Sequence, residues 1–347
     1  MRRIVIAKPG GYDALHLVEE PDPIPGPNEV VIAVAAAGVN YADGIIRMGL
    51  YASAKALHGY PITPGFEVAG TVAGVGHAVR DLALGDAVIA LTLFGGYADR
   101  VCVSRERVFA MPRGMDFAHA AALPAVFLTA WYLVHELVHP REREQWLVHS
   151  AAGGVGGALA QLGHLAGCRV VGVIGATHKR DAAIGAGCSE VIDKSRVPLW
   201  PTAQKLAPHG YDAIFDANGV ATLASSYAHL APAGKLAVYG FASMLPRDGR
   251  VNWLRLAWDW WCTPRFNPLR MTQENRSVVA ANLSFLSSHS ERLIEGMRWL
   301  LTRFEAGDLV APPVTAYPLS AAADAQRAIE SGMTVGKLVL NCTDLHL

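Results

Sequence analysis

A glycine-rich turn between a hydrophobic run and an apolar helical pattern constrains the fold of this chain more than any other feature. The segment at residues 146–158 reads WLVHSAAGGVGGA, so that a predicted strand enters the turn and a predicted helix at 155–166 leaves it. In dinucleotide-binding folds such glycines let the backbone approach a pyrophosphate, which lies at the helix N-terminus. The pattern here is AxGxxG, with Ala151 in place of the first glycine, and the alternative is a plain tight connection.

The rest of the chain shows two kinds of secondary-structure pattern. Hydrophobic runs at 170–174, 213–215 and 235–239 alternate with helical stretches, which predicts a parallel sheet covered on both faces. The first third has β-rich runs at 4–6, 29–34 and 68–72 between clusters of turn residues, and the last part predicts helices at 291–304 and 320–330 and a strand at 337–340. We therefore predict an α/β protein in which a doubly wound parallel-sheet (Rossmann) domain at 125–287 is inserted into a β-rich domain made of 1–124 and 288–347.

Composition excludes several classes of protein. The chain has 347 residues, enough for two domains, and 30 basic against 30 acidic side chains give a net charge of 0. A neutral chain argues against a nucleic-acid binder that works by neutralising phosphates. The five scattered cysteines contain no CxxC pair, which suits a reducing, cytoplasmic location. The longest apolar stretch, 118–134, contains a proline and is shorter than the roughly 20 residues of a spanning helix, so we predict a buried helix preceded by a turn and no transmembrane segment.

The residues after the second predicted strand favour NADPH over NADH. Sites for NAD place an acidic residue there for the ribose 2′-hydroxyl. This chain reads GATHKR at 175–180, with no carboxylate before Asp181. A basic cluster can bind a 2′-phosphate through charge-assisted hydrogen bonds, whereas the alternative is an ordinary solvated start of a helix.

Several motifs in order resemble the zinc-free medium-chain dehydrogenases/reductases of the quinone oxidoreductase group. They are GVNYAD at 38–43, PGFEVAG at 64–70, GGYA at 95–98, the segment 123–131, the glycine turn, and GKLVL at 336–340. The stretch 239–276 is similar to the branch named for the vesicle amine transport protein of synaptic vesicles. The resemblance covers nearly the whole chain, and it implies that the β-rich domain is GroES-like and holds the substrate.

The departures from the zinc enzymes of this superfamily define the expected chemistry. Those enzymes bind catalytic zinc through a cysteine at the position of Asn40 and a histidine at the position of Phe66, and this chain has neither ligand. The four-cysteine lobe is also absent, so no metal is expected. Hydride delivery from NADPH to a quinone or an α,β-unsaturated carbonyl remains, and it depends chiefly on positioning and a proton source.

The resemblance also implies the site residues. Asn40 lies beside the nicotinamide, and Tyr51 lines the cleft either as a proton relay or as a packing aromatic; both are predicted to be catalytic. Thr129 approaches the nicotinamide, and Lys179 and Lys194 hold the 2′-phosphate. The other predicted cofactor-binding residues are Ala152, Gly153, Gly154, Val155, Gly156, Gly175, Asn218, Gly240 and Phe241.

Three further patterns leave alternatives open. HELVH at 135–139 is an HExxH motif, but Pro140 would end its helix, so a metallopeptidase is set aside. The tryptophans at 253, 258, 260 and 261 suggest a lid over a lipophilic substrate or a patch that contacts a membrane. The alternative is that they pack between subunits or domains. An edge strand at 277–283 would explain a homodimer. The second hypothesis for function is a non-catalytic NADPH-binding protein that acts in lipid or membrane association.

Overall fold

The chain folds into two compact units. The computed structural model describes residues 1–244 and 251–343, without the side chains of 287–290. Unit 1 comprises residues 1–128 and 287–343, and unit 2 comprises 129–244 and 251–286. Within the described ranges, no helix combines the length and apolar character needed to cross a bilayer.

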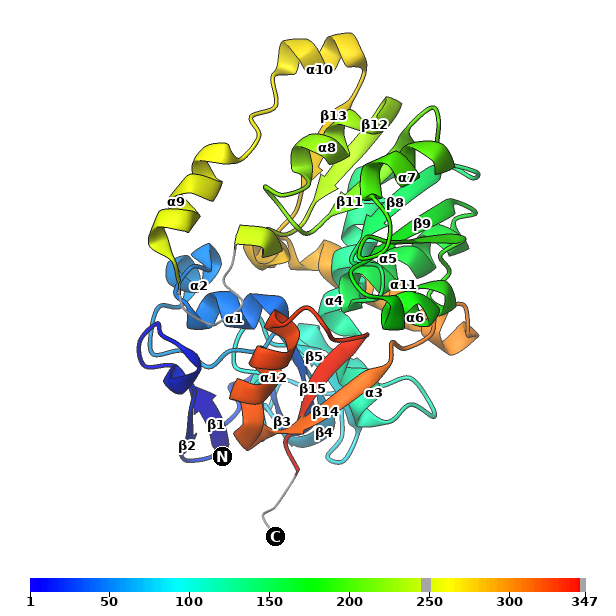
Figure 1. Cartoon of the computed structure of the whole chain (residues 1–347). Coiled ribbons are helices and arrows are strands. Elements are labelled where there is room, and N and C mark those ends of the chain that lie inside the picture. The colour runs from blue at the N-terminus through cyan, green and yellow to red at the C-terminus, as the bar shows by residue number, and fades with distance from the viewer. Residues whose placement is uncertain (245–250, 344–347) are drawn as a thin grey trace. The chain divides into compact units, whose positions relative to one another are not determined.

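Unit 2 contains a six-stranded parallel sheet in the order β10-β9-β8-β11-β12-β13 (Figure 1). In chain order this is 3-2-1-4-5-6, the arrangement of a doubly wound dinucleotide-binding sheet. The strands are β8 (Gln145–His149), β9 (Arg169–Ile174), β10 (Glu190–Asp193), β11 (Tyr211–Asp216), β12 (Leu230–Val238) and β13 (Ser277–Ala280).

Helices pack on both faces of this sheet, which explains why its strands are almost continuously apolar. On one face, α7 and α8 share a hydrophobic core with alternate residues of β8, β9, β11 and β12. On the other face, α5 approaches β8 so closely that a Cβ atom on Gly163 would lie 2.7 Å from the ring of Trp146. The helical segments of unit 2 are η3 (Tyr132–Val138), α5 (Gly154–Leu165), η4 (Thr177–Lys179), α6 (Arg180–Gly185), α7 (Leu199–Leu206), α8 (Leu223–Ala228), η5 (Ala242–Met244), α9 (Trp253–Cys262) and α10 (Pro268–Glu274), with η6 (Leu283–His289) at its end.

Unit 1 is built on a mostly antiparallel seven-stranded sheet. Its order is β14-β15-β3-β4-β5-β7, β6 also pairs with β3, and only β14 and β15 run parallel. The strands are β3 (Glu29–Val39), β4 (Glu67–Val75), β5 (Ala87–Leu91), β6 (Arg100–Ser104), β7 (Val108–Ala110), β14 (Val314–Pro318) and β15 (Lys337–Asn341), beside a separate pair of β1 (Arg2–Val5) and β2 (His16–Glu19).

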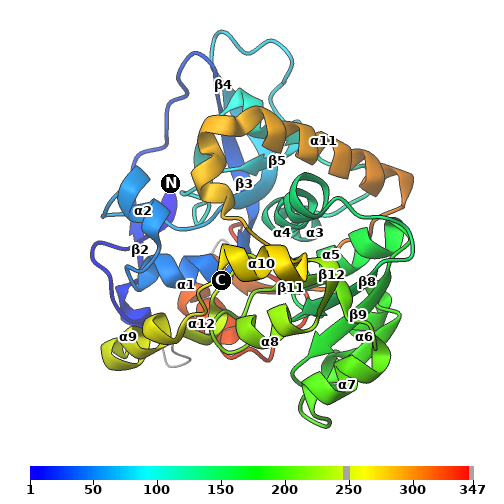
Figure 2. The same cartoon turned by 90° about the horizontal axis from the view of Figure 1, so that it is seen from above.

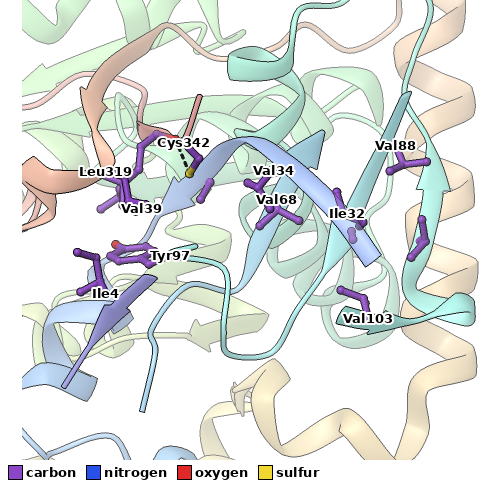
Figure 3. Close-up of a cluster of buried hydrophobic side chains, with 14 of the residues drawn as sticks. Ile4, Ile32, Val34, Val39, Val68, Val88, Tyr97, Val103, Leu319 and Cys342 are labelled. Carbon is purple, nitrogen blue, oxygen red and sulfur yellow. Dashed lines mark hydrogen bonds between the residues drawn. The ribbon is translucent and has the colours of Figure 1, made fainter. Parts of the chain in front are cut away.

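Both faces of this sheet are apolar, because side chains alternate along each strand. Val88 of β5 and Leu340 of β15 join the cluster drawn in Figure 3, together with residues of α12. Their neighbours Ile89 and Val339 join the opposite cluster with α3 and α11, which Figure 2 shows near each other. The helical segments are η1 (Tyr12–Ala14), α1 (Tyr41–Arg47), α2 (Ala52–Leu57), η2 (Arg105–Arg107), α3 (Phe117–Ala121), α4 (Pro124–Trp131), α11 (Ser290–Ala306), η7 (Leu319–Ala321) and α12 (Ala322–Glu330).

A buried ion pair ties α1 to α12. The Arg47 side chain is fully buried, and its guanidinium lies 2.7 Å from a carboxylate oxygen of Glu330. The same guanidinium donates to the side-chain carbonyl of Gln326 at 2.7 Å and stacks on the ring of Tyr12, 4.3 Å from its centroid. Since an unpaired buried charge is costly, these contacts fix the position of α1, whose N-cap is Asn40.

The predicted fold class, a doubly wound parallel-sheet (Rossmann) domain with a β-rich domain, is confirmed. Two local predictions need correction. The stretch 118–134 is not one helix after a turn: α3 and α4 are separate, and α4 continues into the π-helix η3. Pro124 starts α4, because proline is tolerated in the first turn of a helix but not in its interior. The edge strand predicted over 277–283 ends at Ala280.

Candidate functional site

The glycine turn of unit 2 leaves the N-terminus of α5 open to an anion. Ser150 has a φ of 56°, and Gly153 is the N-cap of α5 without a side-chain hydrogen bond to the helix. The first N–H groups of a helix have no partner within it and attract negative charge. A Cβ atom on Gly156 would lie 2.2 Å from the Ser150 carbonyl oxygen, so the turn requires glycine there. Five predicted residues form this turn: Ala152, Gly153, Gly154, Val155 and Gly156.

The alanine in place of the first glycine is accommodated by the neighbouring strand. Ala151 is fully buried, and its N–H donates to the carbonyl of Val173 at 3.1 Å. Its methyl group faces Gly172 of β9, where an added Cβ would lie 2.8 Å away. Because β9 lacks a side chain at that point, the methyl fits without displacing the turn.

Three predicted cofactor-binding residues, Gly175, Lys179 and Lys194, lie on the connections that follow β9 and β10. A Cβ atom on Gly175 would lie 3.7 Å from Cε of Lys194, so the Lys194 side chain passes over the end of β9. Burial lowers the pKa of Lys179, and the nearby charge of Lys194 lowers it further. The two ammonium charges therefore repel each other, and a bound phosphate would relieve that repulsion.

The other predicted cofactor residues of this unit lie on the connections that leave β11 and β12. The ring of Phe241, which is 46% exposed, packs against Gly219, where an added Cβ would lie 2.8 Å from it. A Cβ on Gly240 would lie 2.9 Å from the carbonyl oxygen of Ala217. Asn218, between the two contact points, accepts a hydrogen bond at its carbonyl from the N–H of residue 243 at 2.8 Å. The two connections are therefore in direct contact.

A buried polar network that the sequence did not predict lies beside the turn. Ser226 donates to a carboxylate oxygen of Asp216 at 2.7 Å, and Nε2 of His149 lies 3.2 Å from the same hydroxyl. Because the hydroxyl proton goes to Asp216, the oxygen accepts from Nε2–H, and Nδ1 of His149 carries no proton. Among the described residues Nδ1 has no hydrogen-bond partner. The serine lies between the other two residues, so this is not the order of a nucleophilic triad.

We expect His149 to make the stability of the protein depend on pH. Burial lowers its pKa to about 4, below its ordinary value of 6.5, although the charge of Asp216 opposes this shift. The unfolded chain therefore binds more protons between these values, and stability present above pH 6.5 is lost as the pH falls toward 4. The melting temperature of wild type should drop between pH 7 and pH 5 by more than that of His149→Asn. An equal drop in both would contradict the assignment, and the exposed His209→Asn should behave as wild type.

In unit 1, Asn40 contacts two charged residues that the sequence did not predict. The Lys337 ammonium lies 2.5 Å from Oδ1 of Asn40 and 2.6 Å from Oε1 of Glu67. Nδ2 of Asn40 donates to the same Oε1 at 2.9 Å. Lys337 and Glu67 are 3% and 0% exposed, whereas Asn40 is half-buried. Asn40 is thus the member of this group that a ligand can reach.

Asp43 anchors the backbone at Asn40. It accepts from the Asn40 N–H at 2.7 Å, from the Gly65 N–H at 3.0 Å and from the Tyr97 hydroxyl at 2.9 Å. Burial raises the pKa of Asp43 to about 6, and these three hydrogen bonds hold the rise in check. The carboxylate therefore joins the start of α1 to the 64–70 and 95–98 motifs.

An aromatic wall, formed by Tyr51, His58, Phe66 and Phe94, lies in the same unit. Ring centroids are 5.9 Å apart for Tyr51 and Phe66, 5.8 Å for Phe66 and Phe94, and 5.9 Å for His58 and Phe94. Phe66 directly precedes Glu67 in the chain, and Tyr51, Phe66 and Phe94 are half-buried. Flat apolar groups stack favourably on such partly exposed rings.

The residues around Asn40 do not fit a catalytic zinc. Zinc requires thiolate, imidazole or carboxylate ligands, and here the carboxylate of Glu67 is already paired with the Lys337 ammonium. The neighbouring side chains are an amide and a phenyl ring. A divalent cation at Glu67 would be repelled by the Lys337 ammonium.

Two sequence-predicted features lie on the helical segment that precedes β8 in the chain. Thr129 is a half-buried residue of α4. Residues 135–138 of the HExxH motif lie in η3, a π-helix. The second histidine, His139, lies outside this helix as its C-cap and has a φ of 55°. In the part of the chain that the structure describes, no cluster of three His, Cys, Asp or Glu side chains is arranged to hold a metal ion.

The strand order of unit 2 and the open helix N-terminus are those of a dinucleotide-binding fold. Residues 26–113 match the family described as alcohol dehydrogenase GroES-like domain, and residues 186–340 match zinc-binding dehydrogenase. The synaptic vesicle membrane protein VAT-1 homolog of Rattus norvegicus is 33% identical over 347 residues, which span 98% of this chain and 84% of the rat protein.

Two solved structures are also similar. Escherichia coli quinone oxidoreductase complexed with NADPH has a TM-score of 0.84 and 27% identity, covering 98% of this chain and 100% of that one. The CurK enoyl reductase has a TM-score of 0.84 and 26% identity, covering 98% of both chains. The chain therefore belongs to the medium-chain dehydrogenase/reductase superfamily, and its predicted resemblance to the quinone oxidoreductase group and the VAT-1 branch is confirmed.

Proposed function

We propose that this protein is a zinc-independent, NADPH-dependent reductase of quinones or α,β-unsaturated carbonyls. The observation that carries the proposal is the pair of Lys179, which follows β9, and Lys194, which follows β10; their positive charges suit a 2′-phosphate. The segment 175–180 after β9 also contains no acidic residue that could bind a ribose 2′-hydroxyl. Membership of an oxidoreductase family supports the proposal, as does the similarity to an Escherichia coli quinone oxidoreductase that was crystallised as its complex with NADPH.

The residues of unit 2 fit a dinucleotide. The uncapped N-terminus of α5 would hold the pyrophosphate, because Gly153 and Gly156 leave room for close approach of the backbone. Lys179 and Lys194 would hold the 2′-phosphate, and the connections that carry Asn218, Gly240 and Phe241, together with Thr129, would border the nicotinamide half. When bound, NADPH supplies a hydride.

Unit 1 would bind the acceptor. Asn40 offers a hydrogen-bond donor for a carbonyl oxygen, and the aromatic wall offers a surface for a flat, lipophilic molecule. An acceptor reduced by two electrons takes up one hydride and one proton. We propose that the proton comes from the Tyr51 hydroxyl or from water; Tyr51 packs on Phe66, so a packing role is the alternative.

The first test combines turnover with cofactor preference. Purified protein should oxidise NADPH in the presence of menadione or 2-cyclohexen-1-one. Lys179→Ala should raise KM for NADPH by about 10-fold or more, since a charge-assisted hydrogen bond is lost, and leave KM for NADH unchanged.

Lys205→Ala, at an exposed position on α7, is the matched control and should behave as wild type. Equal losses for NADPH and NADH in Lys179→Ala would contradict the 2′-phosphate assignment. The absence of turnover with every acceptor, despite NADPH binding, would remove the reductase and favour the second candidate.

The second candidate is a non-catalytic NADPH-binding protein that acts in lipid or membrane association. It is favoured by α9, on which Trp253, Leu254, Trp258, Trp260 and Trp261 are between 67% and 86% exposed. At helical spacing these five side chains lie on one side of the helix, and Figure 1 draws α9 away from the six-stranded sheet of its unit. Exposed tryptophans of this kind favour a lipid interface.

Liposome co-sedimentation tests this candidate. If α9 binds lipid, the protein should sediment with vesicles of phosphatidylcholine and phosphatidylserine, and Trp258→Ala should reduce the bound fraction severalfold. Leu84→Ala removes an apolar residue of similar exposure (68%) in unit 1 and should change nothing. Binding that is absent from wild type, or equal in all three proteins, would exclude the candidate.

We further propose a cytoplasmic homodimer. The strand β13 forms one edge of the six-stranded sheet and, among the described residues, pairs with β12. An exposed edge can pair with its copy across a two-fold axis, which would continue the sheet.

A further inference from the structure

The side-chain amide of Asn40 is held by two opposite charges. The Lys337 ammonium donates to Oδ1 at 2.5 Å, and Glu67 Oε1 accepts from Nδ2 at 2.9 Å. The two charged groups are themselves 2.6 Å apart. The amide therefore closes a triangle with a salt bridge that is almost fully buried.

This arrangement permits only one orientation of the amide. A flip about the side-chain bond would turn the NH₂ group toward the ammonium and the carbonyl oxygen toward the carboxylate. Both contacts would become repulsive, and burial strengthens such electrostatic terms. A lone asparagine at a half-exposed position would have no such preference.

The salt bridge is itself held in place by the backbone. The second carboxylate oxygen of Glu67 accepts from the Ala125 N–H at 2.5 Å. A Cβ atom on Gly38 would lie 2.3 Å from Oε1, so the carboxylate fills the space above that glycine. Lys337 starts β15, which pairs with β3 just before Asn40.

One N–H of the Asn40 amide has no acceptor among the described residues, since Nδ2 carries two hydrogens and Glu67 takes one. We propose that Lys337 and Glu67 are positioning residues, which fix the Asn40 amide so that this outer N–H donates to the carbonyl oxygen of the acceptor. The inference rests on the proposed reductase function. In this proposal Lys337 orients the neutral Asn40 amide, in a site whose residues do not fit zinc.

The test measures ligand binding and does not depend on turnover. The protein is saturated with NADP⁺, and calorimetry gives the affinities for α-tetralone, an aryl ketone, and for tetralin, the hydrocarbon without the oxygen. Wild type should bind the ketone about 5- to 10-fold more tightly than the hydrocarbon, as one hydrogen bond permits. Asn40→Ala and Lys337→Met should each abolish this preference, and the double variant should lose no more than either one.

Controls separate positioning from folding. Glu67→Gln combined with Lys337→Met leaves no unpaired buried charge, so it should fold even if Lys337→Met does not, and it should also lose the preference. Lys337→Arg should restore part of it, and Lys55→Met, at an exposed position of α2, should leave it unchanged.

Three results would overturn the inference: a wild type without ketone preference, a preference that survives Lys337→Met, or additive losses in the double variant. A drop in NADP⁺ affinity with an unchanged ketone preference would place the Asn40 donor on the cofactor and would overturn it as well. Failure of wild type to bind NADP⁺ is a different result, because it contradicts the proposed function itself.

Discussion

The salt bridge between Lys337 and Glu67 is the interaction on which the structure around Asn40 in unit 1 depends. It joins the last strand of the chain to β4 and to the end of β3, across 270 residues of sequence. Burying two charges is costly unless they are paired and hydrogen-bonded, and here the partners are an amide and a backbone N–H. The result is a rigid, half-exposed donor at Asn40.

A second constraint acts in unit 2, where backbone N–H groups, and not side chains, form the site for an anion at the start of α5. Gly156 and Ser150 shape a turn that presents the first N–H groups of α5, and Gly172 makes room for Ala151. Positive charge comes from Lys179 and Lys194 on the adjacent connections. The two units thus differ. In unit 1 two buried charges orient the neutral amide of Asn40, whereas in unit 2 two lysines add positive charge near the backbone N–H groups of the turn.

Patterns local in sequence predicted much of this molecule. The glycine turn, the parallel strands and the absence of an acid after β9 all lie within short windows, where periodicity and spacing carry physical meaning. Glu67 lies in the 64–70 motif and Lys337 in the 336–340 motif, but only the pairing of β15 with β3 shows that their side chains meet Asn40. The contact between His149 and Ser226 likewise needs the strand order, and the π-helix depends on tertiary packing. The sequence signal that could have identified Lys337 and Glu67 as site residues is that each is a charged residue in a motif that is otherwise apolar.

The most direct test of the proposed function measures the transfer of a labelled hydride from NADPH to the acceptor. The protein is incubated with NADPH that carries deuterium at both C4 positions of its nicotinamide and with 2-cyclohexen-1-one or menadione, and the product is analysed by mass spectrometry. The account predicts cyclohexanone with one deuterium on the former β-carbon, while the proton on the α-carbon comes from solvent, either directly or through the Tyr51 hydroxyl. Cyclohexanone without deuterium, or unchanged cofactor with both acceptors, would contradict it.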